Sequence, residues 1–189
     1  MPDRTDAFMS THPVQSILIR DSRDDDLPAI HAIYAYHVLN STGTFEIEAP
    51  GIDDMAQRRA DVLKNGFPWL VAEIGGQVAG YAYANLFRLR PAYRNTVENS
   101  IYIDEQLRGR GIGRVLLTAL LERCELLGCR QVLAVIGDSA NTGSIALHSA
   151  CGFRFAGTLR SSGWKFERWL DTVIMQKELG AGDRTPPNR

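Results

Sequence analysis

The sequence predicts an α/β fold in which a mixed, mostly antiparallel central sheet carries helices on both faces. Three observations lead to this prediction. The first strand-like segments follow one another as a meander, and the later ones alternate with amphipathic helical segments, an order typical of a mixed sheet covered on both sides. The length of 189 residues fits one domain with a sizeable core.

The N-terminal half is expected to supply two helices and a hairpin. After a short strand at 17–20, the acidic residues 24–26 can cap a helix that begins near Pro28. Its buried face recurs at helical spacing, at Leu27, Ile30, Ile33, Tyr34 and Val38. A second helix is expected from 53 to 66. Strand-like runs at 69–74 and 77–83 then flank a two-glycine turn, which is a strong hairpin signal.

The C-terminal half alternates strands and helices. The expected elements are a strand at 96–103, a helix from 112 to 128, a strand at 131–136, a helix at 142–151, and strands at 153–159 and 170–177. The predicted folded domain therefore spans 17–179. Polar or Gly/Pro-rich composition predicts flexible tails at 1–16 and 180–189.

Composition excludes several classes of function. Hydrophobic residues make up 44% and charged residues 23% of the chain, and the formal net charge is −1, so we expect neither a membrane span nor a nucleic-acid partner. The three cysteines form no CxxC pair and have no metal-ligand spacing to a histidine. They predict reduced thiols in a cytoplasmic protein without a bound metal. The N-terminus shows no secretory signal.

A glycine-rich turn is the clearest candidate for a ligand site. The segment Arg108–Gly113 reads RGRGIG and lies between a strand and an amphipathic helix, where backbone N–H groups at a helix N-terminus attract anions. The spacing G-x-G-x-G in mid-chain fits neither the Rossmann fingerprint nor a Walker loop. We expect this segment to bind a pyrophosphate group. The alternative is that its glycines only form a tight turn into the helix.

Strand 100–103, this turn and the helix behind it resemble the acyl-CoA motif of the GNAT superfamily of N-acetyltransferases. The resemblance extends over about 17–178 and is closest to the phosphinothricin and methionine sulfoximine N-acetyltransferase branch. The residues that carry it are Ile19–Arg20, Ile33–Tyr34, Ser41–Glu46, Gly80–Tyr83, Thr96–Glu98, Ala134–Gly137, Asn141, Leu147–His148, Gly152–Phe153 and Trp169–Asp171.

The resemblance implies acetyl-CoA as donor, the α-amine of a small amino-acid analogue as acceptor, and a homodimer. It implies that the strand backbone at Ile101, Tyr102 and Ile103 holds the thioester arm and that one N–H there stabilises the oxyanion. The pyrophosphate would lie on Arg108, Gly109, Arg110, Gly111, Ile112, Gly113 and Arg114. Asn141 would reach the pantetheine, and a plain helix cap is its alternative role.

A base must deprotonate the acceptor amine before it attacks, and Glu98 is the first candidate. Strand alternation puts Glu98, Ser100 and Tyr102 on one face; the alternative is an ion pair between Glu98 and Arg94. His148 has a suitable unperturbed pKa of about 6.5, but it can equally be a packed residue whose ring nitrogens are satisfied. His31 and His37, on the first helix, are expected to be structural or exposed.

An acidic acceptor needs a cationic partner, and Arg88, with Arg90 in reserve, precedes Glu98 in a basic connection. A solvated loop is the alternative. Asn99 and Ser100 are expected beside the acceptor, and Phe45 and Glu46 are candidates for closing its pocket. The competing functions are acetylation of another amine, such as a polyamine, an aminoglycoside or a protein N-terminus, and a non-catalytic acyl-CoA-binding module.

Overall fold

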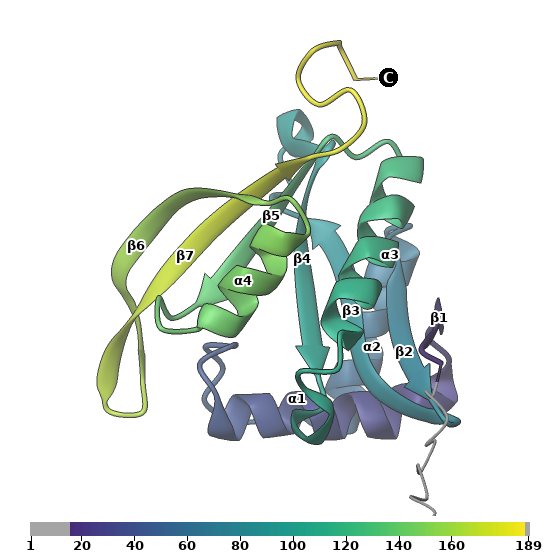
Figure 1. Ribbon diagram of the computed structural model, residues 1–189, viewed down its shortest axis with the longest axis vertical. Helices are drawn as coiled ribbons and strands as arrows, with labels where there is room; N and C mark the ends of the chain where they lie inside the picture. Colours follow the sequence, from purple (N-terminus) through teal and green to yellow (C-terminus); the bar gives the residue numbers. More distant parts are fainter. Residues whose placement is uncertain (1–15, 188–189) are drawn as a thin grey trace, which may run out of the picture.

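A computed structural model describes residues 16–187 as one seven-stranded sheet with two helices on each face (Figure 1). In chain order the elements are β1 (Leu18–Asp21), α1 (Leu27–Asn40), α2 (Ile52–Lys64), β2 (Trp69–Ile74), β3 (Gln77–Leu86), β4 (Thr96–Ile103), α3 (Ile112–Leu126), β5 (Gln131–Gly137), α4 (Thr142–Ala150), β6 (Arg154–Lys165) and β7 (Arg168–Glu178). Single 3₁₀ turns at Asp24–Asp26, Pro91–Tyr93 and Glu105–Leu107 join some of them.

The spatial order of the strands is β1-β2-β3-β4-β5-β7-β6. Every neighbouring pair is antiparallel except β4 and β5, which run parallel because α3 returns the chain between them. The predicted mixed, mostly antiparallel sheet with helices on both faces is therefore confirmed. None of the helices among the described residues is long and apolar enough to cross a membrane.

Side chains alternate across the central strands, so the two faces of the sheet differ in character. The face beneath α3 is lined by small residues of β2, β3 and β4, namely Ala72, Ala82, Ala84 and Val97. Small side chains leave room for Leu116, Leu117 and Leu120 of α3 to approach closely, and all three are fully buried. Each buried leucine contributes roughly 2 kcal/mol of hydrophobic stabilisation.

The opposite face, beneath α1 and α2, is aromatic. The rings of Trp69 and Tyr83 stack with centroids 4.2 Å apart, and Tyr81 stacks on Tyr102 at 5.3 Å. Tyr34 of α1 meets Tyr102 edge-on at 5.0 Å. These offset and edge-to-face arrangements are the favourable geometries for aromatic pairs, and they fix α1 against β4.

The final hairpin departs from the expectation. The strands predicted at 153–159 and 170–177 extend to Arg154–Lys165 and Arg168–Glu178, and they meet in a two-residue turn at Phe166–Glu167. Most of β6 is exposed because it is the last strand of the sheet, so its sequence lacks buried-face alternation. Both turn residues have a positive φ without being glycine, which removes the usual sequence signal for a hairpin turn.

The predicted tails lie at the two ends of the chain, and only part of the C-terminal one is described. Residues 1–15 lie outside the described part of the chain. At the other end, the Arg130 guanidinium donates hydrogen bonds to the carbonyl of Gly182, the hydroxyl of Thr185 and the carbonyl of Pro186. The segment 180–187 therefore lies against the start of β5.

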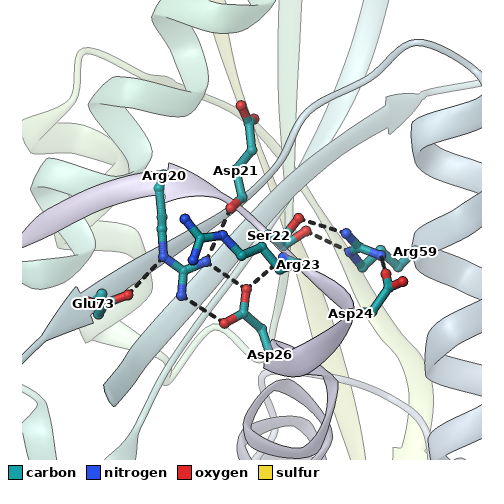
Figure 2. A network of polar contacts seen from close by, with 8 residues as sticks. All are labelled: Arg20, Asp21, Ser22, Arg23, Asp24, Asp26, Arg59 and Glu73. Carbon is teal, nitrogen blue, oxygen red and sulfur yellow. Dashed lines mark hydrogen bonds and ion pairs between the residues drawn. The ribbon is translucent and has the colours of Figure 1, made fainter. Parts of the chain in front are cut away.

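A network of charged side chains joins β1, the start of α1 and α2 (Figure 2). The Arg20 guanidinium donates to both carboxylate oxygens of Asp26, at 2.7 and 2.8 Å, and to Glu73 at 2.8 Å. The Arg59 guanidinium donates to the hydroxyl and the carbonyl of Ser22. The hydrogen bonds from Arg20 hold the pKa of Asp26 below its ordinary value, so this bidentate pair stabilises the fold while Asp26 is ionised.

We predict that Asp26→Ala lowers the free energy of unfolding by about 3 kcal/mol, because it leaves the guanidinium of Arg20 without its buried partner. The pKa of Asp26 is depressed in the folded state, so its contribution is present above the unfolded-state pKa and is lost as the pH falls through about 4 and below. Urea unfolding at pH 7 and at pH 3 measures both effects.

The matched control is Asp21→Ala, which removes an ion pair with Arg123 whose side chains are 63% and 48% exposed. Exposed pairs contribute at most about 1 kcal/mol. Equal losses in the two variants would contradict a special role for the Arg20–Asp26 pair.

Candidate active site

The parting of β4 from β5 creates the main cavity. The two strands pair from Thr96–Gln131 to Asn99–Ala134 and no further, although β4 continues to Ile103 and β5 to Gly137. Beyond the last pair the strands line a cleft of about 760 Å³, together with the end of α1, the glycine-rich turn and the start of α4. Backbone groups on the facing edges are left without strand partners there.

The β3–β4 register shows which groups of β4 face this cleft. The N–H of Asp104 donates to Ala79 and the N–H of Phe87 donates to Thr96, so the even-numbered residues of β4 bond to β3. Residues alternate in direction along a strand, so the N–H and C=O groups of Ile101 and Ile103 point away from β3. His37 Nε2 lies 2.9 Å from the carbonyl of Ile103. The N–H and C=O of Ile101 and the N–H of Ile103 remain for a ligand.

The glycine-rich turn forms one end of the cleft. Gly109 and Gly111 have φ values of 75° and 79°, a left-handed conformation that favours glycine. Nothing lies within 4 Å of a Cβ placed at either position. The backbone conformation, and not a lack of space, therefore accounts for glycine there. Gly111 caps α3 without a side-chain hydrogen bond. The first N–H groups of α3 therefore face the cleft unsatisfied by any side chain, which is the arrangement that binds phosphate groups.

Asn141 caps α4, which was the alternative role considered for it, and it also lies at the cleft. Its Oδ1 accepts a hydrogen bond from the N–H of Ser144 at 3.3 Å and caps α4, while its Nδ2 lies 3.4 Å from the carbonyl of Gly137. The residue also lines the cleft. It can thus hold the start of α4 in place and present its amide to a ligand.

A second, smaller cavity of about 180 Å³ lies on the other face of β4. It is lined by Tyr83, Asn85, Leu86, Glu98 and Ser100, among which Tyr83 pairs with Ser100 and Asn85 with Glu98 across β3 and β4. Ser100 belongs to the linings of both cavities. This residue is therefore part of the wall of each cavity.

Glu98 is a partly buried carboxylate in the small cavity. Burial raises its pKa above the ordinary value for glutamate. No ion pair joins Glu98 to any residue in the described range, so the pairing with Arg94 that was its alternative role is not formed. A carboxylate of this kind is a better proton acceptor near neutral pH than a freely solvated one.

Comparison with known proteins identifies the fold. Residues 30–153 match the acetyltransferase (GNAT) family. The chain belongs to this family. It is 54% identical over 169 residues to phosphinothricin N-acetyltransferase of Alcaligenes faecalis, covering 89% of this chain and 86% of that protein. It is 41% identical to L-methionine sulfoximine/L-methionine sulfone acetyltransferase of Pseudomonas aeruginosa, covering 87% and 95%.

A solved GNAT structure agrees closely with this chain. The phosphinothricin acetyltransferase of Sinorhizobium meliloti in complex with AcCoA has a TM-score of 0.89 and 46% identity, covering 92% of this chain and 94% of that one. The predicted membership of the phosphinothricin and methionine sulfoximine branch is thereby confirmed.

Several site residues predicted from the GNAT motif line the main cleft. They are Asn99, Ser100, Ile101, Tyr102, Ile103, Arg108, Gly109, Gly111, Ile112, Gly113, Arg114, Asn141 and His148. Arg110 is exposed and does not line it. Arg108 also pairs with Glu105 at 2.9 Å, so this guanidinium is positioned before any ligand binds.

His148 and Glu98 lie on opposite faces of the sheet. Alternation along β4 turns Glu98 to the aromatic face with Tyr102, and turns Asn99 to the face of α4. There Asn99 Nδ2 lies 3.0 Å from His148 Nε2, and His148 Nδ1 lies 2.8 Å from the carbonyl of Ser144. Both ring nitrogens are occupied and burial lowers the pKa of His148, which favours the packed role over proton transfer.

Three of the residues proposed to bind the acceptor, Arg88, Arg90 and Phe45, do not line either cavity. Arg88 and Arg90 are exposed and line neither cavity, although Arg88 follows Leu86 by two residues at the end of β3 that reaches the small cavity. Its guanidinium lies over the ring of Phe87. Phe45 packs against Gly137 and Gly163, where any Cβ would overlap its ring. It lines neither cavity.

A buried lysine at the tip of the β6–β7 hairpin forms hydrogen bonds with the loop 41–45. Lys165 is only 4% exposed, and its Nζ donates to the carbonyls of Ser41 and Thr44, both at 2.9 Å. A Cβ at Gly137 would overlap the carbonyl oxygen of Thr42, so the loop packs directly on the end of β5. Ser41, Thr42 and Gly43 line the cleft, which makes the loop one of its walls.

The sequence analysis did not predict that His37 and Lys165 shape the cleft, and the reasons differ. His37 lies in the cleft lining and is 5% exposed. Its spacing of four residues from Ile33 and three from Tyr34 is the signal that could have placed it on the buried face of α1. Lys165 carries no such signal, because it lies in an otherwise exposed strand and its partners are more than a hundred residues away.

We predict that Lys165→Met loosens the loop 41–45, because both of its hydrogen bonds to loop carbonyls are lost. The free energy of unfolding should fall by about 2 kcal/mol, and the amides of residues 41–45 should exchange faster with deuterium. Lys64→Met is the control, since Lys64 is exposed at the end of α2. Unchanged exchange in the loop of the Lys165 variant would contradict this role.

Proposed function

We propose that this protein is an acetyl-CoA-dependent N-acetyltransferase that acetylates the α-amine of a small amino-acid analogue of the phosphinothricin or methionine sulfoximine type. The proposal rests on the two cavities that share Ser100 as a lining residue. One cavity offers backbone groups and a helix N-terminus suited to an acyl-CoA, and the other offers a buried carboxylate suited to an amine. The activities of the similar proteins support the same choice.

The main cleft suits acetyl-CoA by size and by chemistry. A volume of about 760 Å³ lies in the usual range for cofactor sites. The glycine-rich turn and the start of α3 hold the pyrophosphate, and Arg108 and Arg114 add positive charge beside it. The free N–H and C=O of Ile101 bind polar groups of the thioester arm. Within residues 16–187, no three His, Cys, Asp or Glu side chains gather as a metal site requires.

The chemistry needs a neutral amine next to the thioester carbonyl. Glu98 accepts a proton from the acceptor's ammonium group, directly or through a water molecule, and the freed nitrogen lone pair attacks the carbonyl carbon. The N–H of Ile101 stabilises the negative charge that develops on the carbonyl oxygen. The new C–N bond forms, the C–S bond breaks, and the thiolate of CoA leaves and takes up a proton.

The acceptor's acidic group is bound by the basic connection after β3. Arg88, with Arg90 as second choice, extends from the end of β3 that lines the small cavity, and the described ion pairs of the chain include neither. Guanidinium groups bind carboxylate and phosphinate groups through paired hydrogen bonds. Asn99 and Ser100 contribute from β4.

We predict that wild-type protein releases CoA from acetyl-CoA with phosphinothricin or methionine sulfoximine, and that Glu98→Gln lowers kcat by roughly 10²- to 10⁴-fold because the base is lost. The pH profile of the wild type should fall on the acid side, since protonation removes the base. Because burial raises the pKa of Glu98, this fall should lie above the ordinary glutamate pKa. Glu122→Gln, an exposed change on α3, is the control.

A panel of ordinary amino acids and polyamines completes the same assay. Turnover with polyamines alone would overturn the assignment of the basic connection. Binding of acetyl-CoA without turnover of any amine would indicate an acyl-CoA-binding module instead.

The proposal includes a cytoplasmic homodimer. Three free cysteines suit a reducing compartment. Strand β6 forms an edge of the sheet, and its hairpin exposes Phe155, Leu159, Trp164 and Trp169, each more than half exposed. Exposed strand edges and clustered apolar side chains are typical of protein interfaces.

We predict that sedimentation at micromolar concentration gives twice the monomer mass and that Trp169→Glu gives the monomer, because a charge is placed in the apolar surface. Leu126→Glu, at an exposed position on α3, should leave the mass unchanged. A wild-type monomer across this concentration range would rule the dimer out.

A further inference from the structure

A hydrogen-bond donor and a carboxylate lie next to each other in the small cavity. Asn85 of β3 and Glu98 of β4 are direct cross-strand partners, and both line this cavity of about 180 Å³. Directly opposed residues of an antiparallel pair have Cβ atoms about 5 Å apart and point to the same face of the sheet. One small ligand can therefore contact both side chains at once.

A neighbouring backbone group determines how the Asn85 amide is oriented. Trp69, the first residue of β2, pairs with Tyr83, so β3 has no strand partner on that side at Leu86. The N–H of Leu86 donates instead to Asn85 Oδ1 at 2.9 Å. Only the oxygen of a side-chain amide can accept this hydrogen bond. The amide nitrogen, with its two N–H donors, therefore occupies the other position.

The amide nitrogen of Asn85 and the carboxylate of Glu98 are both unpaired and accessible. Within residues 16–187, neither group forms a side-chain hydrogen bond or an ion pair of its own. The side-chain atoms of this range that are both buried and without a partner belong to Trp69, Tyr81 and Asn99. Asn85 and Glu98 are half-buried and do not belong to that group, so a molecule in the cavity can reach their free atoms.

These two groups complement the polar groups of an α-amino acid. A carboxylate accepts hydrogen bonds from an ammonium group, and an amide N–H donates to a carboxylate. In an α-amino acid the ammonium and the carboxylate are attached to the same carbon atom, which suits two neighbouring side chains on paired strands. An amine without a carboxylate would leave the Asn85 donor without a partner in a half-buried cavity, and such a loss weakens binding.

We propose that Asn85 is a specificity-determining residue, whose Nδ2 donates a hydrogen bond to the α-carboxylate of the acceptor while Glu98 receives a proton from the α-ammonium group. This inference rests on the proposed function and names the part of the acceptor that the small cavity recognises. The guanidinium of Arg88, three residues further along the chain, supplies the positive charge that a side-chain amide lacks.

Two acceptors that differ in a single group test the proposal. L-methionine sulfone carries the α-carboxylate, and its α-amide carries an uncharged group in the same place. CoA release from acetyl-CoA is measured with both acceptors in wild type, Asn85→Leu, Asn85→Asp and Gln77→Leu, at a pH at which Glu98 is ionised. The quantity compared is the kcat/KM for the acid divided by that for the amide, because effects on the base or on acetyl-CoA cancel in this ratio.

Asn85→Leu should lower the kcat/KM for the acid roughly 10- to 100-fold, as expected for a hydrogen bond to a charged group. The uncharged amide should lose less, so the ratio should fall. Asn85→Asp keeps an oxygen for the N–H of Leu86, but its second oxygen repels a carboxylate and can accept from an amide N–H. Its ratio should be lower still. Gln77→Leu, at the exposed start of β3, is the control and should keep the wild-type ratio.

The aspartate variant separates recognition of the acceptor from support of the strand. If the Asn85 side chain only holds the N–H of Leu86, Asn85→Asp will keep the wild-type ratio, and this result would overturn the proposal. Should Asn85→Leu fail to fold or lose both acceptors equally, Asn85→Asp still decides. Wild-type protein that acetylates neither these acceptors nor phosphinothricin would instead refute the proposed function itself.

Discussion

The rest of the site depends on the limited pairing of β4 with β5. The strands β1 to β4 pair along their lengths, and so do β5, β7 and β6, but the two groups are joined by only four residue pairs, from Thr96–Gln131 to Asn99–Ala134. Each of the two inner strands keeps its outer partner to the end, β3 for β4 and β7 for β5. The sheet can therefore open at this joint without losing either half.

Contacts from distant parts of the chain hold the opening in shape. The ring of His37 on α1 is hydrogen-bonded to the carbonyl of Ile103. The loop 41–45 packs on Gly137 at the end of β5. Lys165 ties that loop to the β6–β7 hairpin. One wall of the cleft thus depends on α1, β5 and the final hairpin at once, so changes far from the cleft in sequence are expected to alter it.

The alternation of side chains along β4 places its polar side chains on two different faces of the sheet. Glu98, Ser100 and Tyr102 face the aromatic side, where the small cavity lies, whereas Asn99 faces α4 and reaches His148. Ile101 between them offers its backbone to the cleft. A carboxylate on one face and an amide on the other thus lie beside two different cavities that share Ser100 as a lining residue.

The fold was largely predictable from sequence because its signals are local. Hydrophobic periodicity, the Gly75–Gly76 turn and the RGRGIG turn each lie within a short segment. Contacts over long separations were not predictable: the pairing of Asn99 with His148 spans 49 residues and that of Lys165 with Ser41 spans 124. The β6–β7 turn escaped because Phe166 and Glu167 adopt a conformation that favours glycine. Periodicity does place Glu98 and Asn99 on opposite faces, but it does not show what covers each face.

We propose that acetyl-CoA binds along the open edge of β4. Amide hydrogen exchange measured residue by residue by NMR, with and without acetyl-CoA, tests it most directly. We expect the N–H groups of Ile101 and Ile103 to become strongly protected when acetyl-CoA binds. The N–H of Tyr102, which already bonds to β3, should be protected in both states. Protection that appears elsewhere while Ile101 and Ile103 remain unchanged would contradict the account.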